Sequence, residues 1–204
     1  MKIKHTRFFA KTVSLGLVAV AMLVVGTSAS AAVVINAIES GGHVVFSFSG
    51  SVDLTGATST GGTAVSSVIN PGVPLVDFGG TLSDSYNLAN GNGTTFGTSG
   101  AHFASIHNTG DIFVYVGSAT PRIEVPDGYV SGNALSGSMT FNNATFASLG
   151  ITPGTYVWDM KLVGTGTVDQ NVTLNVVPEP SKICLLGFVS LGLALMRRRC
   201  LDIA

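Results

Sequence analysis

Apolar and polar residues alternate in several short stretches of the chain, and clusters of Gly, Pro, Asn and Asp separate these stretches. A period of two puts successive side chains on opposite faces of a strand, so the pattern predicts β-strands. Phe46 and Phe48 share one such face, and Tyr156 and Trp158 share another. The predicted strands cover residues 33–38, 43–48, 63–69, 111–116, 135–141, 155–162 and 168–176.

Many short strands between turns are typical of a two-layer all-β domain. We therefore predict a mostly β protein, with one antiparallel β-sandwich or jelly-roll-like domain over residues 32–176. Two stretches, 51–62 and 87–100, are rich in Gly, Ser and Thr and predict long loops.

Residues 144–150 have the one helical pattern in this body, long enough for a turn or two. Asn143 is the predicted cap at its start, because Asn side chains accept hydrogen bonds from the first free N–H groups. Gly150 is the predicted end, because glycine readily adopts the left-handed conformation that closes a helix.

The first 31 residues have the three parts of a secretory signal peptide. A basic start precedes an apolar run over 13–25, and Ala29 and Ala31 occupy the small positions of a cleavage site. We expect cleavage of 1–31 after Ala31, by way of the general secretion machinery, because no twin-arginine pair precedes the apolar run. The alternative is an uncleaved N-terminal anchor.

The last residues, 177–204, combine a proline spacer, an apolar run and a basic cluster. Pro178 and Pro180 flank Glu179, and both prolines favour extended backbone that donates no hydrogen bond. The uncharged run 183–196 predicts a transmembrane helix, although it is shorter than the roughly 20 residues that usually span a bilayer. The basic cluster that would stop it on the cytoplasmic side is Arg197, Arg198 and Arg199. A buried helix of a soluble domain is the alternative.

The order of these parts resembles the PEP-CTERM sorting signal of Gram-negative bacteria. The resemblance implies that an exosortase-type protease recognises Pro178, Glu179 and Pro180 and then removes the helix. It also implies that the inner membrane holds the chain only transiently, and that the mature protein reaches the cell surface or the medium. Lys182 and Cys184 depart from the usual pattern.

Residues 126–176 show a second resemblance, to the C-terminal half of a common group of PEP-CTERM proteins. It rests on Pro-Asp-Gly-Tyr-Val-Ser-Gly at 126–132, on 144–150, and on Thr-Pro-Gly-Thr-Tyr-Val-Trp at 152–158. Members often have a second Trp-Gly where this chain has Asp-Met-Lys at 159–161. The resemblance implies a structural module and brings no enzymatic activity with it.

Without its two ends the chain is acidic. Residues 32–177 contain two basic residues, Arg122 and Lys161, against nine acidic ones, which gives a net charge of −7. Such a charge repels phosphate backbones, so nucleic-acid binding is not expected. Both cysteines, Cys184 and Cys200, lie in the tail, which excludes a disulfide framework or a thiolate metal site in the body.

Histidines offer two candidate sites. His102, His107 and Asp111 have an H-x4-H-x3-D spacing, with His43 as a third histidine in the body. Residues five apart face opposite sides of a strand, so this spacing does not predict a metal site. Ser99 near His102 suggests a hydrolase pair, but no Gly-x-Ser-x-Gly elbow is present. No metal and no cofactor are expected.

Acidic residues offer two further kinds of candidate site, a pair of catalytic carboxyls and a calcium site. Asp77 with Asp84, and Glu124 with Asp127, are candidate carboxyl pairs for glycoside hydrolysis. Acids that satisfy turns and keep the surface soluble explain the same residues. Asp53 and Asp127 lie in loop-like places that suit calcium, but no calcium-loop pattern surrounds them. We therefore assign no catalytic residue from the sequence.

These patterns predict an exported, non-enzymatic protein with a structural or adhesive role at the cell surface or in a biofilm matrix. The expected partners are an exosortase-type protease, the secretion machinery and exopolysaccharide. One alternative is a secreted carbohydrate-active enzyme on a β-sandwich. Another is an ice- or glycan-binding module. Ice binding would need a regular array of threonines, and Thr55, Thr58, Thr60 and Thr63 are too irregularly spaced for it.

Overall fold

A computed structural model of the chain describes residues 32–62, 66–89, 93–118, 120–164 and 170–178. Within these ranges the protein is mostly β, with eleven strands in two largely antiparallel sheets and no helix. The described residues therefore contain no helix that is long and apolar enough to cross a membrane. Pro178 is exposed directly after the last strand. The predicted signal peptide with Ala29 and Ala31, and the tail residues Glu179, Pro180, 183–196 and Arg197 to Arg199, lie outside the described residues.

The first sheet has the strand order β10-β11-β1-β2-β9. Its strands are β1 (Ala32–Ser40), β2 (His43–Gly50), β9 (Leu135–Asn142), β10 (Gly154–Asp159) and β11 (Asn171–Val177). The first and last strands pair in parallel, with Ala32 opposite Asn171 and Ile38 opposite Val177. The predicted antiparallel arrangement holds for the other strand pairs and not for this one, because no hairpin constrains the direction of two strands from opposite ends of the body.

The second sheet has the strand order β5-β8-β7-β4-β3-β6, and its strands pair antiparallel throughout. Its strands are β3 (Val68–Asn70), β4 (Leu75–Phe78), β5 (Ser83–Asn87), β6 (His102–Phe103), β7 (Phe113–Val116) and β8 (Arg122–Pro126).

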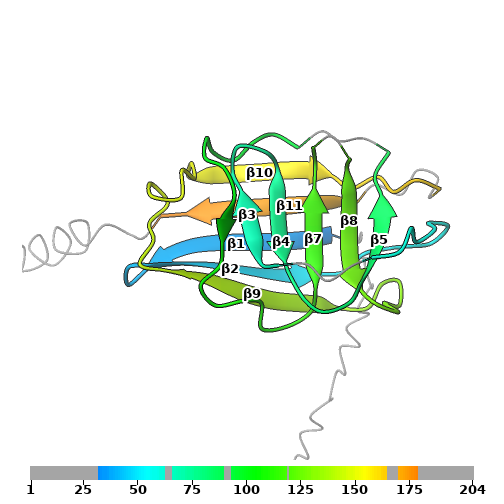
Figure 1. Ribbon diagram of the computed structural model, residues 1–204. Helices are drawn as coiled ribbons and strands as arrows, with labels where there is room; N and C mark the ends of the chain where they lie inside the picture. Colours follow the sequence, from blue (N-terminus) through cyan, green and yellow to red (C-terminus); the bar gives the residue numbers. More distant parts are fainter. Residues whose placement is uncertain (1–31, 63–65, 90–92, 119, 165–169, 179–204) are drawn as a thin grey trace, which may run out of the picture.

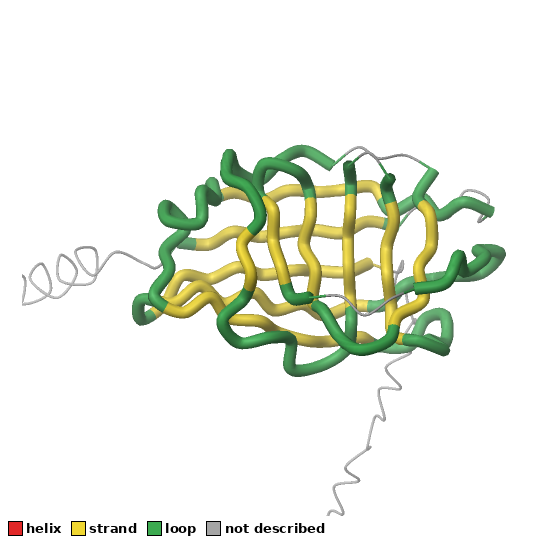
Figure 2. The backbone as a smooth tube through the Cα atoms, in the orientation of Figure 1, coloured by secondary structure: helices red, strands yellow, loops and turns green. Residues whose placement is uncertain are grey.

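The two sheets lie face to face, and the strands of the second run across those of the first (Figures 1 and 2). Inward-facing side chains from both sheets form one apolar cluster. Phe48 of β2 contacts the rings of Phe78 and Phe113, at centroid distances of 4.5 and 5.5 Å. Trp158 of β10 stacks on Tyr115 of β7 at 4.8 Å, with 6° between the ring planes. The core therefore lies between the sheets, which is compatible with the predicted β-sandwich.

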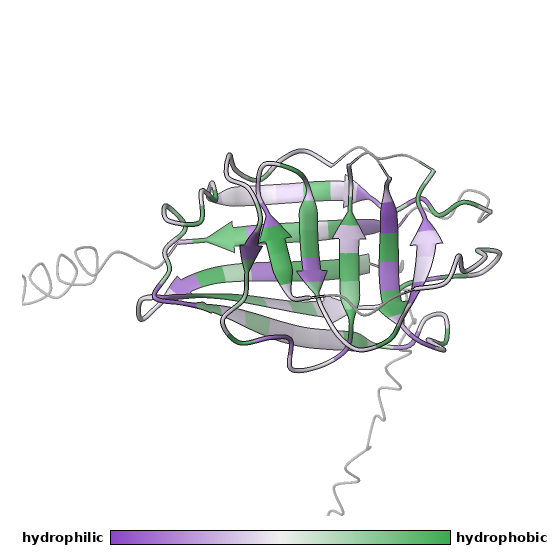
Figure 3. Ribbon diagram, in the orientation of Figure 1, coloured by the Kyte–Doolittle hydropathy of each residue, from purple (hydrophilic) through white to green (hydrophobic). Residues whose placement is uncertain are grey.

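The alternating pattern located the strands of the first sheet well and those of the second poorly. The predicted ranges agree to within a few residues with β1, β2, β9 and β11. Each of these strands buries one face and leaves the other more exposed to solvent, which produces the alternation. The predicted strands 63–69 and 111–116 shorten to β3 and β7, and residues 63–65 lie outside the described ranges. The pattern missed β4, β5, β6 and β8. β8 does alternate, as its colours in Figure 3 show, but over only five residues.

The predicted helical segment forms one turn, in which the Leu149 N–H donates to the Thr145 carbonyl at 3.0 Å. Thr145 Oγ1 accepts from the Ser148 N–H at 3.0 Å, and Ser148 Oγ accepts from the Thr145 N–H at 2.8 Å. Thr145 is therefore the cap, and the prediction of Asn143 is wrong. Asn143 instead has a left-handed φ of 51°. Gly150 ends the turn with a φ of 63°, as predicted.

Among the described residues of the two Gly-rich stretches predicted as loops, only Asn87, the last residue of β5, belongs to a strand. Both loops are nevertheless fixed to the core. Val52 in the first and Phe96 in the second are completely buried. Phe96 lies 5.9 Å from the ring of Trp158. The described residues of these loops are therefore part of the packed body.

Candidate functional site

The outer face of the second sheet carries a row of buried polar residues. The register places Ser85 opposite Glu124, Glu124 opposite Val114, and Val114 opposite Asp77. These residues face away from the core, yet Ser85, Glu124 and Asp77 are only 6%, 3% and 7% exposed. Two strand spacings separate the backbones of Asp77 and Glu124, which is about 10 Å. The fold thus brings two carboxyl groups into one neighbourhood.

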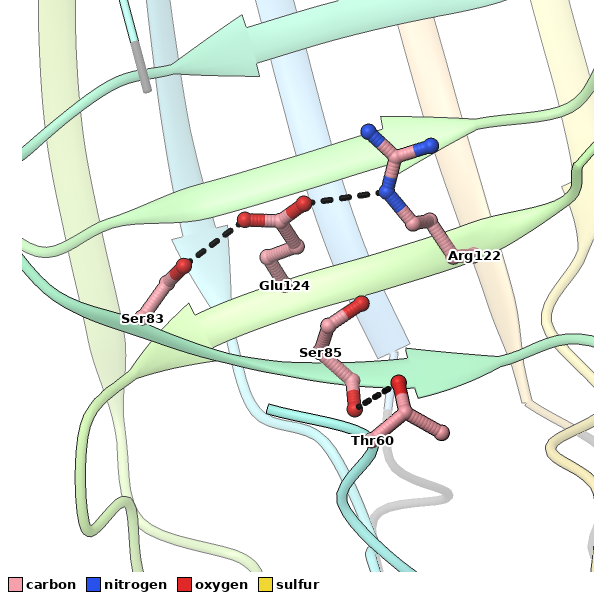
Figure 4. A network of polar contacts seen from close by, with 5 residues as sticks. All are labelled: Thr60, Ser83, Ser85, Arg122 and Glu124. Carbon is pink, nitrogen blue, oxygen red and sulfur yellow. Dashed lines mark hydrogen bonds and ion pairs between the residues drawn. The ribbon is translucent and has the colours of Figure 1, made fainter. Parts of the chain in front are cut away.

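Glu124 is the centre of a polar network on this face (Figure 4). The Ser83 hydroxyl donates to Glu124 Oε2 at 2.7 Å. Arg122, two residues earlier on β8 and therefore on the same face, donates from Nε to Glu124 Oε1 at 3.0 Å. A buried carboxylate is costly unless it is paired and hydrogen-bonded, and here each oxygen has a donor. Glu124 is therefore held in one position.

The end of the loop 51–62 lies against β5 beside this network. The Thr60 N–H and hydroxyl both donate to the Ser85 carbonyl, at 2.8 and 3.1 Å. Gly62 packs so closely on β5 that a Cβ there would lie 1.8 Å from the Ser83 carbonyl oxygen. Only a residue without a side chain fits this approach. The glycine therefore brings loop backbone directly to the polar row.

Loop, β5 and β8 together enclose an open pocket of about 350 Å³. Its lining residues are Thr60, Gly61, Gly62, Ser85, Arg122 and Glu124. The Arg122 side chain is 36% exposed and that of Glu124 is 4% exposed, so the guanidinium lies at the mouth and the carboxylate lies below it. In Figure 4 the two terminal nitrogens of Arg122 point away from Glu124.

Asp77, unlike Glu124, has a carboxyl oxygen without a hydrogen-bond donor among the described residues. Its burial raises the pKa to about 8, the negative charge of Glu124 adds to the increase, and the positive charge of Arg122 opposes it. Its Oδ1 is buried and finds no hydrogen-bond partner in the described part of the chain. At neutral pH the carboxyl is therefore mostly protonated, which avoids a second buried negative charge beside Glu124.

This arrangement is suited to binding more than to bond cleavage. Both oxygens of Glu124 already accept hydrogen bonds, which restrains it as a base or nucleophile. Asp77 does not line the pocket. What the pocket offers a ligand is the terminal nitrogens of Arg122 as donors and the Ser85 hydroxyl as donor or acceptor.

Neither acid pair predicted from the sequence forms. Asp84 lies opposite the core residue Val125, so its side chain leaves the sheet on the face opposite to that of Asp77. Asp84 accepts instead from the Ser59 hydroxyl at 2.9 Å and the Gly128 N–H at 3.0 Å. Asp127 is exposed in the turn after β8, whereas Glu124 is buried.

Ser99 and His102 do meet, but not as a catalytic pair. His102 Nε2 lies 2.9 Å from Ser99 Oγ, and the Ser99 hydroxyl donates to the Leu149 carbonyl. A hydroxyl has one proton to donate, so Nε2 must be the donor to Ser99 and cannot accept its proton. The pair ties the loop 87–100 to the turn that ends at Gly150.

The residues considered for metal binding remain apart. No group of three His, Cys, Asp or Glu side chains in the described ranges could hold a metal ion. Asp111 accepts from the Ser136 N–H at 2.8 Å, and His107 is exposed. Asp53 accepts from Thr55 and Ser131, and these hydrogen bonds lower its pKa. Each acid thus has a local role in fixing a turn or loop.

Arg122 is a site residue that was not predicted from the sequence, although two signals pointed to it. Arg122 is one of only two basic residues in the body, and it lies two residues from Glu124. A period of two in a strand puts such a pair on one face. The contribution of Ser83, Ser85 and Asp77 depends on which strands are neighbours, and the sequence pattern contains no information on that order.

Comparisons with protein-family models, with curated proteins and with solved structures found no match.

Proposed function

We propose that this chain is an exported protein with a structural or adhesive role at the cell surface or in an extracellular polysaccharide matrix. The observation that carries the proposal is the tail, in which Pro178, Glu179 and Pro180 precede an uncharged run and three arginines. An exosortase-type protease would process this tail after the secretion machinery has moved the body across the inner membrane.

The body supports this role. We infer that its two layers form one β-sandwich domain, stabilised by a continuous core and by loops that are fixed to it. Its net charge of −7 disfavours nucleic acid as a partner and keeps the surface soluble. Its polar pocket presents hydrogen-bonding groups suited to the hydroxyls of a matrix glycan.

The test of this proposal is the intact mass and location of the protein in cells with and without the sorting protease. Processing predicts that cells with the protease release a form that lacks both the signal peptide and the arginine-rich end. Cells without it should retain the tail in the inner membrane. Finding the intact tail in the inner membrane of both strains would contradict the proposal and leave a C-terminally anchored protein.

The second candidate function is that of a secreted carbohydrate-active enzyme, and the coupling of Asp77 with Glu124 favours it. Glycoside hydrolases use two carboxyl groups, one of which is protonated, and burial with the nearby charge of Glu124 raises the pKa of Asp77 to about 8, so that Asp77 is mostly protonated at neutral pH. Release of reducing ends from polysaccharides distinguishes the two functions. Activity that is lost in both Asp77→Asn and Glu124→Gln would support the enzyme, whereas an inactive wild-type protein supports the structural role.

A further inference from the structure

We propose that the pocket formed by Thr60, Gly61, Gly62, Ser85, Arg122 and Glu124 binds a neutral polyhydroxylated ligand, such as one hexose unit of an uncharged glycan. This inference deepens the proposed function and rests on it, because it names the class of matrix molecule that the body would hold. It depends on four properties of the pocket: its free donors and acceptor, its charge, its size and its rigidity.

The free polar atoms of the pocket match adjacent hydroxyl groups. Arg122 engages Glu124 through Nε, and within the described residues its two terminal nitrogens make no hydrogen bond. The Ser85 hydroxyl likewise makes none there, and Figure 4 shows it on the side away from Thr60. Each sugar hydroxyl both donates and accepts, so neighbouring hydroxyls can use the guanidinium and Ser85 together.

The charge of the pocket selects against ions. Arg122 and Glu124 neutralise one another, and Asp77 behind them is mostly uncharged at neutral pH. An anion on the guanidinium would also face the buried Glu124 carboxylate and the negative body. A cation at Glu124 would lie beside the positive guanidinium of Arg122 and compete with it for the carboxylate. A neutral ligand meets neither penalty.

The lining also selects against apolar ligands, because none of its six described residues has a large apolar side chain. Its volume of about 350 Å³ lies at the small end of the range for ligand pockets, which suits one sugar unit of a longer chain. Thr60 and Gly62 fix the loop wall on β5, so little order has to be gained on binding.

The test uses the purified full chain in a detergent without a sugar head group. Its retention is measured on immobilised neutral glycans (glucan, mannan, galactan and xylan) and on polygalacturonate. We expect retention on at least one neutral glycan and weaker retention on polygalacturonate. Arg122→Gln should weaken the retention about tenfold, the effect of losing charge-assisted hydrogen bonds.

Lys161→Gln is the matched control, because Lys161 is the other basic residue of the body, is exposed and lies outside the pocket. It changes the net charge by the same amount and should leave retention unchanged. Ser85→Ala leaves the ion pair intact and should weaken retention about threefold without altering thermal unfolding.

The proposal is overturned if no neutral glycan retains the chain, if polygalacturonate retains it best, or if Arg122→Gln and Lys161→Gln have equal effects. Location in the cell does not enter this measurement. If the chain binds glycan but keeps its tail in the inner membrane, the sorting proposal is wrong and the binding site is supported. If the chain is released but binds no glycan, the sorting proposal is supported and the binding site is wrong.

Discussion

Asp77 shows how the sheet determines the chemistry of one side chain. Its carboxyl is buried on the outer face of β4, in the neighbourhood of Glu124, and Oδ1 has no partner among the described residues. In the unfolded chain the same carboxyl would titrate near pH 3.9. The folded protein therefore keeps a proton that the unfolded chain has already released above that pH.

This difference predicts a pH-dependent stability. Between about pH 4 and the folded pKa of about 8, the folded state binds more protons, so the free energy of unfolding falls as the pH rises, by up to roughly 5 kcal/mol. Asp77→Asn removes the titration, so the variant should be the more stable protein at pH 9. Urea unfolding from pH 5 to pH 9 measures this, with the exposed Asp127→Asn as the control. If the free energy of unfolding changes with pH equally in the wild type and in Asp77→Asn, Asp77 does not titrate in this range.

At the scale of elements, the loop 51–62 depends on its contact with β5. Its position is fixed by backbone hydrogen bonds and by the close approach of Gly62, not by large side chains near the pocket. The polar wall of the pocket therefore depends on a single position without a Cβ.

Replacing Gly62 by Ala should lift this loop from β5. The new Cβ would lie 1.8 Å from the Ser83 carbonyl oxygen, which is backbone and cannot rotate away. We expect a loss of about 1–3 kcal/mol in stability, as for other overpacked sites. Gly100→Ala is the control, because nothing lies within 4 Å of a Cβ there. Thermal unfolding of the two variants measures the difference, and equal melting temperatures would contradict the close packing.

The elements also show which part of the fold the sequence could predict. Strands such as β1 and β2 have one buried face and one more exposed face, so their apolar and polar residues alternate, and this alternation identified them. β4 carries Asp77 beside apolar residues and buries its last three residues, so no alternation remains. β5 has Tyr86 as its one large apolar residue. The pocket could not be predicted either. It forms between β5, β8 and the loop 51–62, and the hydrophobic pattern does not say which of these segments are neighbours in the fold.

At the scale of the whole molecule, the two basic residues of the body have very different surroundings. Lys161 is exposed, whereas Arg122 is tied to a buried carboxylate. Because residues 32–177 are acidic and one of their two basic residues lies in the pocket, the pocket is a small neutral area on a negative body. Long-range attraction of charged partners should therefore be weak at this pocket, and short-range hydrogen bonding would determine which ligand the proposed site prefers.

The parallel pairing of β1 with β11 has a mechanical consequence. Ala32 begins one strand and Val177 ends the other, and since Val177 lies opposite Ile38, these two ends are about 20 Å apart along the pair. Tension applied between them loads the whole ladder of hydrogen bonds in shear, so that many bonds must break together.

Force spectroscopy can measure this resistance. Handles at Ala32 and Val177 should give a high rupture force. Handles at Ala32 and Ser51, which meet at the open end of the β1–β2 hairpin through a 3.1 Å hydrogen bond, should open the strands one bond at a time at a lower force. Equal forces would contradict the shear geometry. Pull applied between Ala32 and Val177 would therefore pass through two adjacent strands of the first sheet, with little load on the sheet that carries the pocket.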